Sequence, residues 1–461
     1  MPVNLCTNCT FAFERKYYMT PLTVAFHTLG CKLNFSETSA LARLFVDHGY
    51  QPIPITQGAD ICVINTCSVT EQADRECRKI VRQLLRVHPE SFVVVTGCYA
   101  QLKPSEIAEI SGVDLVLGAG EKFRMLEYID NLSKLPGKGL IYVGDVQSVN
   151  TFTSSFSFGD RTRSFLKVQD GCDYKCTFCT IPQARGKSRS DDIESVVQKV
   201  NQISALGIKE IVLTGVNIGD FGKRTGTREG YELKKEERFI DLITTLDSIT
   251  GIDRYRISSI EPNLLTKEII RFVASSQKFM PHFHLPLQSG NNKQLAAMKR
   301  RYTRELYSDR VELIKNIMPH ASIGVDVITG FPGETEEDFL STYNYLNELE
   351  ISYLHVFTYS ERANTPAAIM EGSVPIRERR NRTNALRGLS EMKRRSFYTT
   401  NTGCTRPTLF EKSKNGNLIT GFTDNYIKIE LPGHEELLNT IHTVRLERLS
   451  ANGEVMIGCL R

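Results

Sequence analysis

The chain alternates short apolar runs with helix-like stretches, and this alternation constrains its fold more than any other feature. Strands separated by helices pair in parallel, because each helix crosses back over the sheet. In the first third of the chain the expected strands and helices are Val24–Thr28, Asn34–Asp47, Ile61–Asn65, Glu71–Arg86, Phe92–Thr96, Pro104–Ile110 and Val113–Leu117. Asn34 and Glu37 have the spacing of a capping box at the start of the first helix. This region predicts an open, mostly parallel α/β domain.

A second series of the same kind follows a Ser/Thr-rich stretch, Thr151–Asp160, which we interpret as a linker. Its expected strands are Phe165–Gln169, Glu210–Leu213, Tyr255–Ser258, His282–Leu285, Ser322–Ile328 and Tyr353–Phe357. Six such units are too few for a closed eight-fold barrel and predict a partial (β/α)6 barrel. A helix over Arg377–Phe397 is expected to end this region.

Beyond residue 398 the pattern changes to short strands punctuated by glycine and asparagine, which is typical of a small antiparallel β-barrel. The expected strands there are Thr408–Glu411, Tyr426–Glu430, His442–Glu447 and Val455–Cys459. A chain of 461 residues is long enough for several domains. We expect an extra, disordered N-terminal segment, an α/β domain, a barrel domain and a β domain, over residues 1–20, 21–150, 151–398 and 399–461.

The composition sets limits on where the protein acts. No run approaches the roughly 20 apolar residues that span a bilayer, and the charged N-terminal stretch is a poor signal peptide. We therefore expect a cytoplasmic protein without a membrane partner. In that reducing compartment, twelve cysteines indicate metal ligands or catalytic thiols before disulfides. The net charge of +4 is too small to indicate nucleic-acid binding by itself, so any basic surface must be local.

Cys172, Cys176 and Cys179 lie together immediately after an expected strand. Thiolates are soft ligands that suit iron–sulfur clusters or zinc. Three thiolates on one loop can hold three irons of a four-iron cluster, which leaves the fourth iron open to a small molecule. Zinc sites usually combine two CxxC pairs. The CxxxCxxC spacing therefore favours an iron–sulfur cluster with an open iron over a structural zinc site.

Three further cysteines each follow an expected strand of the first series: Cys31, Cys67 and Cys98. The carboxyl ends of parallel strands share one edge of the sheet, so residues far apart in sequence converge there. Gly30 and Gly97 precede two of them and permit tight turns. We interpret the set as a second cluster site, against the alternative of buried free cysteines.

The other cysteines point to no chemistry as clearly. A lone CxxC, Cys6 and Cys9, lies in the N-terminal segment, where a disordered tail competes with a zinc or redox role. Four are expected to be structural: Cys62, Cys77, Cys404 and Cys459.

Both constellations sit in longer segments that resemble the radical S-adenosylmethionine methylthiotransferases over nearly the whole chain. The matching segments are TLGCKLNFSE, INTCSVTEQAD, VTGCYAQ, VQDGCDYKCTFCTIPQARGKSRS, HLPLQSGNNKQLAAMKRRYT, DVITGFPGETEEDF and FTYSERANTPA. A CxxxCxxC triad alone would indicate only the superfamily, whereas the combination indicates the family.

Within that family, Lys32 and Leu33 of the GCKLN motif resemble the bacterial group that acts on threonylcarbamoyladenosine in tRNA. Relatives that act on isopentenyladenosine usually carry a GCQMN-like motif, and those that act on a ribosomal protein usually carry GCPKN. Both remain alternatives. An alternative of another class is a non-enzymatic iron–sulfur sensor that binds RNA.

The resemblance implies a reaction, its cofactors and its partners. Two 4Fe-4S clusters and two S-adenosylmethionine molecules would serve to insert a methylthio group at C2 of N6-threonylcarbamoyladenosine, position 37 of tRNA. The triad cluster would bind S-adenosylmethionine and generate the radical, and the cluster on Cys31, Cys67 and Cys98 would carry the sulfur. An electron donor such as flavodoxin or ferredoxin would be required.

Other candidate residues follow from their positions at strand ends. Barrel enzymes place their sites at the carboxyl ends of the strands, so we expect cofactor contacts there from Thr214, Gly215, Asn217, Glu261 and Gln288. Turn geometry or packing is the competing explanation for each. Asp326, a polar residue in an apolar strand, is either a site residue or a satisfied core carboxylate.

The expectation that RNA is a partner depends on basic and aromatic residues. The arginine-rich helix Arg377–Arg395 could follow phosphates, or it could be a solvated helix face. A second basic cluster is Lys299–Arg301. The C-terminal region resembles a TRAM domain, which would grip tRNA, and its Phe422 and Tyr426 could stack on bases or pack in the core.

Overall fold

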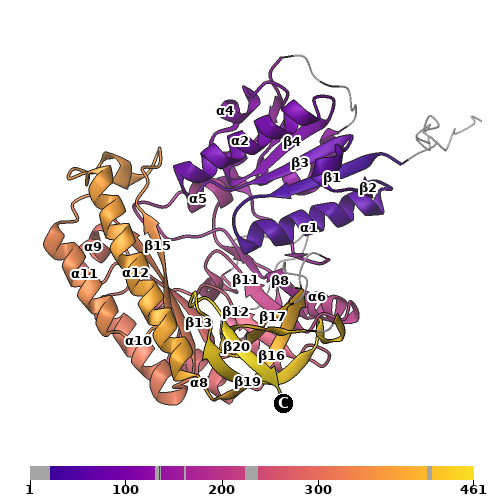
Figure 1. Ribbon diagram of the computed structural model, residues 1–461. Helices are drawn as coiled ribbons and strands as arrows, with labels where there is room; N and C mark the ends of the chain where they lie inside the picture. The colour runs from indigo at the N-terminus through magenta and orange to yellow at the C-terminus, as the bar shows by residue number, and fades with distance from the viewer. Residues whose placement is uncertain are drawn as a thin grey trace, which may run out of the picture.

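The computed structural model describes residues 21–129, 134, 137–159, 162–223, 237–412, 418–433 and 435–461. The expected N-terminal segment with Cys6 and Cys9 lies outside these ranges. Figure 1 shows an N-terminal α/β region at the top, central strands ringed by helices, and a yellow C-terminal barrel packed at the opposite end. The predicted fold class is confirmed. Among the described helices, none combines the length and apolar character that crossing a bilayer needs.

The N-terminal sheet is parallel throughout, in the order β2-β1-β3-β4-β5-β6. Its strands are β1 Thr23–Thr28, β2 Gln51–Pro52, β3 Ile61–Thr66, β4 Phe92–Gly97, β5 Leu115–Leu117 and β6 Leu140–Tyr142. Its helices are α1 Lys32–Asp47, α2 Glu71–Val87, α3 Cys98–Leu102 and α4 Pro104–Ala108. The short edge strands β2 and β6 were not predicted: β2 carries no apolar run, and the apolar run of β6 is only three residues long.

The predicted capping box at α1 is wrong. The helix begins at Lys32 with Cys31 as its N-cap residue, so Asn34 and Glu37 lie inside the helix and are fully buried. Asn34 Nδ2 donates instead to the carbonyl oxygens of Leu29 and Thr66, at 2.7 and 3.0 Å. The spacing predicted a local cap, but both side chains instead bind residues that are distant in the sequence.

The central region has its six parallel strands in chain order. They are β8 Arg163–Lys167, β11 Glu210–Thr214, β12 Arg254–Ile257, β13 His282–Gln288, β14 Ser322–Thr329 and β15 Tyr353–Thr358. Only the isolated bridges Tyr255–Phe279 and Ser259–His284 join β12 to β13 in the described chain. This is the predicted partial barrel. Part of the predicted linker is itself a strand, because β7 Ser155–Phe156 pairs antiparallel with β8.

Helices cover the outer face of these strands. They are α6 Ile193–Ala205, α7 Phe239–Asp247, α8 Lys267–Ser275, α9 Asn292–Ala297, α10 Arg304–Ile317, α11 Glu336–Glu348 and α12 Ile376–Thr400. Between β8 and α6, a short antiparallel pair and a helix carry the loop of the cysteine triad: β9 Gln169–Asp170, α5 Ile181–Arg185 and β10 Arg189–Ser190.

Two arginines of the basic helix α12 are structural. Arg379 and Arg382 are buried, and Arg382 Nη1 lies 2.8 Å from Glu334 Oε2. Arg379 donates to the Val374 carbonyl at 2.6 Å and pairs with Glu361 at 2.5 Å. For these two residues the phosphate-binding interpretation is wrong, since their guanidinium groups hold α12 against the barrel.

The C-terminal region is a closed barrel in the order β16-β17-β18-β20-β19. Its strands are β16 Thr405–Lys412, β17 Leu418–Thr423, β18 Lys428–Pro432, β19 Ile441–Leu449 and β20 Met456–Leu460. β17 was not predicted from the sequence. The next strand was expected to begin at Tyr426, which lies in a turn with a φ of +68°.

Candidate functional site

Cys31, Cys67 and Cys98 follow the neighbouring strands β1, β3 and β4, whose carboxyl ends share one edge of the sheet. The chain near Cys31 passes tightly over Cys67: a Cβ on Gly30, whose φ is +102°, would lie 2.6 Å from Cys67 Cβ and 2.8 Å from its Sγ. Glycine is therefore required there. The predicted convergence of the strand-end cysteines agrees with this close approach.

Two thiols of this set, those of Cys67 and Cys98, are buried, whereas Cys31 is exposed. Burial, followed by the neighbouring Cys98, raises the pKa of Cys67 to about 12. Burial also raises the pKa of Cys98. A metal binds thiolates and displaces the thiol protons, so loading this site would release protons. Two buried thiols, Cys67 and Cys98, beside the exposed thiol of Cys31 fit a soft metal cluster by the chemistry of their donors.

The triad Cys172, Cys176 and Cys179 lies on the loop between β9 and α5, and each sulfur accepts a hydrogen bond. The backbone N–H groups of Tyr174 and Ile181 donate to the sulfurs of Cys172 and Cys179, at 3.4 and 3.5 Å. Arg300 Nη1 donates to Cys176 Sγ at 3.1 Å. Donors aimed at sulfur stabilise its anionic form, so this loop fits a cluster bound through three thiolates.

Arg300 and Glu261 form a buried ion pair beside this loop. Glu261 was predicted as a cofactor contact. In the structure it contacts Arg300, and the same Arg300 side chain donates to Cys176 Sγ. Arg300 was assigned to a basic cluster for RNA, which is wrong because its side chain is buried and turned inward. Arg301 stacks over the Tyr174 ring at 3.9 Å.

A buried charge network links the two cysteine sites. Glu37, on the helix that follows Cys31, accepts from Arg185 Nη1 and Lys167 Nζ at 3.0 Å each, and from Lys122 Nζ at 2.6 Å. Arg185 lies on α5, which follows Cys179. Burial alone would raise the pKa of Glu37, but these cations hold it well below its usual range. The network fixes the N-terminal region against the barrel.

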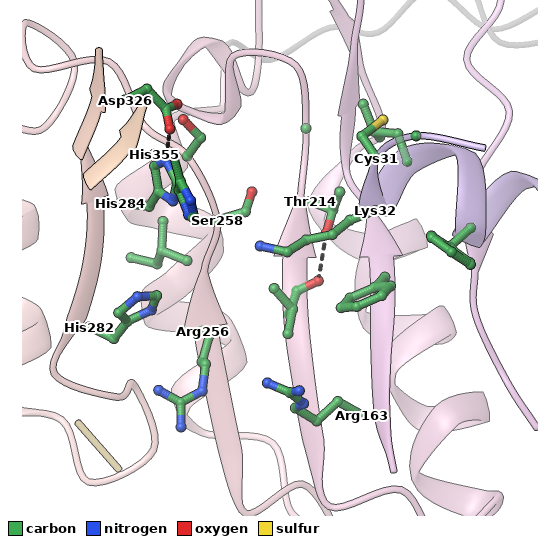
Figure 2. A pocket seen from close by; sticks show the side chains of 18 of the residues that line it. Cys31, Lys32, Arg163, Thr214, Arg256, Ser258, His282, His284, Asp326 and His355 are labelled. Atoms are coloured by element: carbon green, nitrogen blue, oxygen red, sulfur yellow. Dashed lines mark hydrogen bonds and ion pairs between the residues drawn. The ribbon is translucent and has the colours of Figure 1, made fainter. Parts of the chain in front are cut away.

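A cavity of about 640 Å³ lies between the N-terminal region, the inner face of the barrel strands and the C-terminal barrel. Figure 2 shows the side chains that line it. Of the predicted site residues, Cys31, Thr214 and Gly215 line it. Asn217 and Gln288 do not; the Asn217 amide instead donates to Asp220 at 2.8 Å. The volume suits a ligand of nucleoside size.

His284, Asp326 and His355 meet on one wall of this cavity, with ligand atoms within 4.8 Å of one another. His284 Nε2 lies 2.8 Å from Asp326 Oδ1, and the two imidazole rings stack at 5.3 Å. Asp326 was a candidate from the sequence, whereas the two histidines were not, although the alternation in HFHLPLQ places His284 on the inner face.

Such a group can hold a metal ion, yet its surroundings are cationic. Lys32, Arg163 and Arg256 line the same cavity, where Asp326 is the sole carboxylate among the described lining residues. Burial lowers the pKa of His355, and the charges of His284 and Lys32 lower it further. This environment favours a polar or anionic ligand over a further cation.

Phe422 and Tyr426 were expected either to stack on bases or to pack in the core. In the structure their rings stack on each other at 4.9 Å, and Tyr426 also stacks on His282 at 4.1 Å. Arg163 covers the Phe422 ring at 4.6 Å. The pair thus packs between the C-terminal barrel and the central strands, where Tyr426 forms part of the cavity wall.

Comparison with known proteins agrees with this arrangement. Residues 166–346 match the model of the Radical SAM superfamily, and residues 23–118 match that of Uncharacterized protein family UPF0004. A structure of the radical S-adenosylmethionine methyltransferase TsrM from Kitasatospora setae superposes with a TM-score of 0.54 at 15% identity, covering 75% of each chain. That likeness shows the fold.

Two curated relatives are similar over nearly their whole length. The threonylcarbamoyladenosine tRNA methylthiotransferase MtaB of Bacillus subtilis is 40% identical, covering 92% of this chain and 93% of its own. The protein of the same name from Aquifex aeolicus is 40% identical over 90% and 98%. The tRNA-2-methylthio-N(6)-dimethylallyladenosine synthase of Carboxydothermus hydrogenoformans is 32% identical over 78% and 80%.

The barrel and its cysteine loop define an enzyme of the radical S-adenosylmethionine class, which uses a 4Fe-4S cluster and S-adenosylmethionine. Within that class, the chain belongs to the methylthiotransferase family and is most similar to its MtaB group. The resemblance found in the sequence is confirmed.

Proposed function

We propose that this enzyme inserts a methylthio group at C2 of N6-threonylcarbamoyladenosine at position 37 of tRNA. Support comes from relatives named for this nucleoside at 40% identity. The observation that carries the proposal is the position of Cys31: it faces the same cavity as Thr214 and Gly215, which end a barrel strand. A sulfur carried at the N-terminal cysteines and a nucleoside held by the barrel would then meet in one space.

We assign two 4Fe-4S clusters, one to Cys172, Cys176 and Cys179 and the other to Cys31, Cys67 and Cys98. When bound, the clusters supply electron transfer to S-adenosylmethionine and a site for the inserted sulfur, with two S-adenosylmethionine molecules consumed and a donor such as flavodoxin or ferredoxin supplying electrons. The chain orients these groups: Arg300 positions Cys176, and the Glu37 network sets the distance between the two cysteine sites.

Iron content tests the two-cluster assignment. Anaerobically reconstituted enzyme should hold about eight irons per chain, and Cys67→Ala and Cys176→Ala should each hold about four. Cys404→Ala is the matched control, since Cys404 is exposed and outside both sets. About four irons in the unmodified enzyme would remove the second cluster and the sulfur-inserting reaction with it.

Mass spectrometry of tRNA nucleosides tests the substrate. A strain without the gene should lack the methylthio form of threonylcarbamoyladenosine and should regain it when the gene is restored. Loss of the methylthio form of isopentenyladenosine, or of a modified ribosomal protein, would move the enzyme to another branch of its family. If reduced protein failed to cleave S-adenosylmethionine, it would be a sensor.

A further inference from the structure

Lys32 is the one cavity-lining cation without a protein partner in the described part of the chain. It is the first residue of α1, directly after Cys31, and its side chain is half-buried. Figure 2 shows its ammonium group extending from the α1 side into the middle of the cavity, toward Ser258 and the strands that carry the histidines. No hydrogen bond or ion pair within the described residues uses this ammonium group.

The other two lining cations are neutralised by the fold. Arg163 Nε lies 2.8 Å from Glu411 Oε1. Arg256 Nε lies 2.9 Å from Glu210 Oε1, and its Nη atoms donate to the backbone carbonyls of Thr423 and Asp424 at 2.7 and 2.8 Å. A cation withdrawn from bulk water is disfavoured unless it is paired. Lys32 therefore presents an unmatched positive charge to whatever occupies the cavity.

Asp326 acts on Lys32 only across the cavity, because its ion pair in the described structure is with His284. It is the sole carboxylate among the described lining residues, and its Oδ1 is engaged by His284 Nε2 at 2.8 Å. With Arg163 paired to Glu411 and Arg256 paired to Glu210, Lys32 is left as the lysine or arginine of the described cavity wall that has no ion pair. The counter-charge for Lys32 is expected to come from the ligand.

The nucleoside of the proposed function carries such a charge. In a threonylcarbamoyl group the threonine is joined through its amino nitrogen, so this nitrogen is no longer basic and the α-carboxylate remains free. The group is therefore an anion at neutral pH. The dimethylallyl group named for the related synthases is a hydrocarbon without charge. One ammonium group can thus separate the two kinds of adenosine.

We propose that Lys32 determines the specificity of this enzyme by binding the free α-carboxylate of the threonylcarbamoyl group. The inference rests on the proposed function and names the residue that would recognise its substrate. A phosphate oxygen of the tRNA backbone has the same chemistry and is the other source of anionic charge. The two sources differ in one respect: every tRNA carries phosphates, whereas the carboxylate is present only on the modified adenosine.

The test compares one tRNA in three forms, with threonylcarbamoyladenosine, with its carboxyl methyl ester, or with unmodified adenosine at position 37. Reconstituted wild-type enzyme should bind the first form about 10- to 100-fold more tightly than the other two, the effect of one charged hydrogen bond. Lys32→Met should bind all three alike, and its kcat/KM for the first form should fall by a similar factor. Lys32→Arg, which keeps the charge, should retain the preference.

Lys138→Met is the matched control, because Lys138 is an exposed lysine of the same region that pairs with Glu109. It should retain the full preference. Equal weakening of all three tRNAs by Lys32→Met would assign Lys32 to phosphate, and an unchanged preference would mean that it contacts neither; both overturn the inference. The ester arm uses wild-type enzyme and stands even if Lys32→Met loads no iron. Wild-type enzyme that failed to methylthiolate the first form would instead overturn the proposed function.

Discussion

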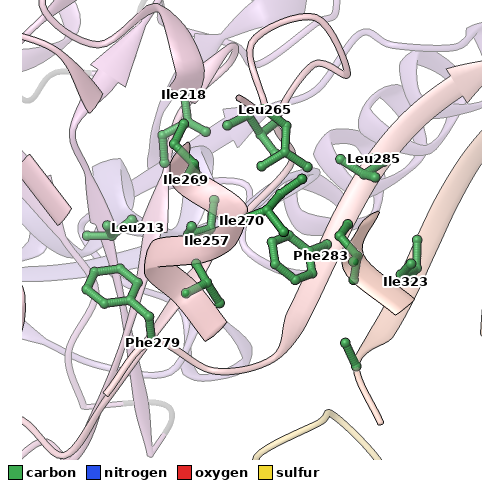
Figure 3. Packing of buried hydrophobic residues seen from close by; sticks show 14 of the residues in the cluster. Leu213, Ile218, Ile257, Leu265, Ile269, Ile270, Phe279, Phe283, Leu285 and Ile323 are labelled. Atoms are coloured by element: carbon green, nitrogen blue, oxygen red, sulfur yellow. The ribbon is translucent and has the colours of Figure 1, made fainter. Parts of the chain in front are cut away.

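The two faces of the central strands differ sharply in character. On β13, Phe283 and Leu285 point into the apolar layer between strands and helices (Figure 3), whereas His282 and His284 line the cavity (Figure 2). Because successive side chains of a strand point to opposite faces, each strand both packs the core and presents polar groups. The same alternation continues on β14, with Ile323 outside and Asp326 inside.

The side chains that stabilise the fold and those that can contact a ligand therefore lie largely on opposite faces of the same strands. Residues of the outer face should affect unfolding and leave ligand specificity intact, and residues of the cavity wall should do the reverse. Glu210 is the exception on the inner face. It is fully buried and pairs with Arg256, which binds the C-terminal barrel.

The largest effect on stability is therefore expected at Glu210, where the separation should break down. Glu210→Ala leaves Arg256 buried without its anion, so the free energy of unfolding should fall by about 3–5 kcal/mol in urea denaturation. Glu109→Ala removes an exposed partner of Lys138 and should cost no more than about 1 kcal/mol. Equal costs for the two variants would mean that the buried pair contributes no more than a surface pair.

On the outer face, Leu285→Ala should lower the free energy of unfolding by about 2–5 kcal/mol, because it removes a fully buried side chain and leaves a cavity. Leu340→Ala, at an exposed leucine, should cost much less. Below the unfolding temperature, Leu285→Ala should keep the iron content and the tRNA preference of the parent enzyme. A changed tRNA preference would show that the two faces are coupled.

Lowering the pH should show a smaller contribution of Glu210 to the stability of the fold. Burial alone would raise its pKa, but Arg256 and then Arg163 hold it below the ordinary value of 4.5. The stabilisation is present above pH 4.5 and is lost as the pH falls through the folded-state pKa. Urea midpoints measured from pH 7 to pH 3 should thus fall less steeply for Glu210→Gln than for the parent. Parallel curves would exclude this carboxylate as a source of acid sensitivity.

The smallest effect on stability is expected at Asp326. Asp326→Asn keeps the volume and can still accept from His284, so the free energy of unfolding should change by less than about 1 kcal/mol. Because the change removes the one carboxylate among the described residues that line the cavity, tRNA methylthiolation should fall although iron content is retained. Unchanged activity together with lost stability would make Asp326 a core carboxylate.

The elements that a sequence reveals best are those defined by local patterns. The apolar runs predicted four strands of the N-terminal sheet and the six parallel strands of the central region. The strand-end rule placed Cys31, Cys67 and Cys98 at one sheet edge. β17 was missed because its residues alternate in a closed barrel without an apolar run.

Side chains whose partners lie far away in sequence could not be assigned. Glu37 fits a capping box by spacing, yet its partner Arg185 lies 148 residues further along the chain. Arg382 looked like a phosphate ligand because Glu334 is 48 residues away. His284, Asp326 and His355 come from three neighbouring strands, β13, β14 and β15, and the pairing of these strands brings them together. No single segment of the sequence contains all three residues.

The Glu37 network also limits how related enzymes can exchange their N-terminal regions and barrels. Arg185 and Lys167 belong to the barrel side, whereas Glu37 and Lys122 belong to the N-terminal side. A chimera that joined this barrel to a foreign N-terminal region without the glutamate would bury cations with too little negative charge. Recombination between relatives is thus constrained to inherit the two sides as a matched pair, and the boundary near residue 150 is a poor crossover point.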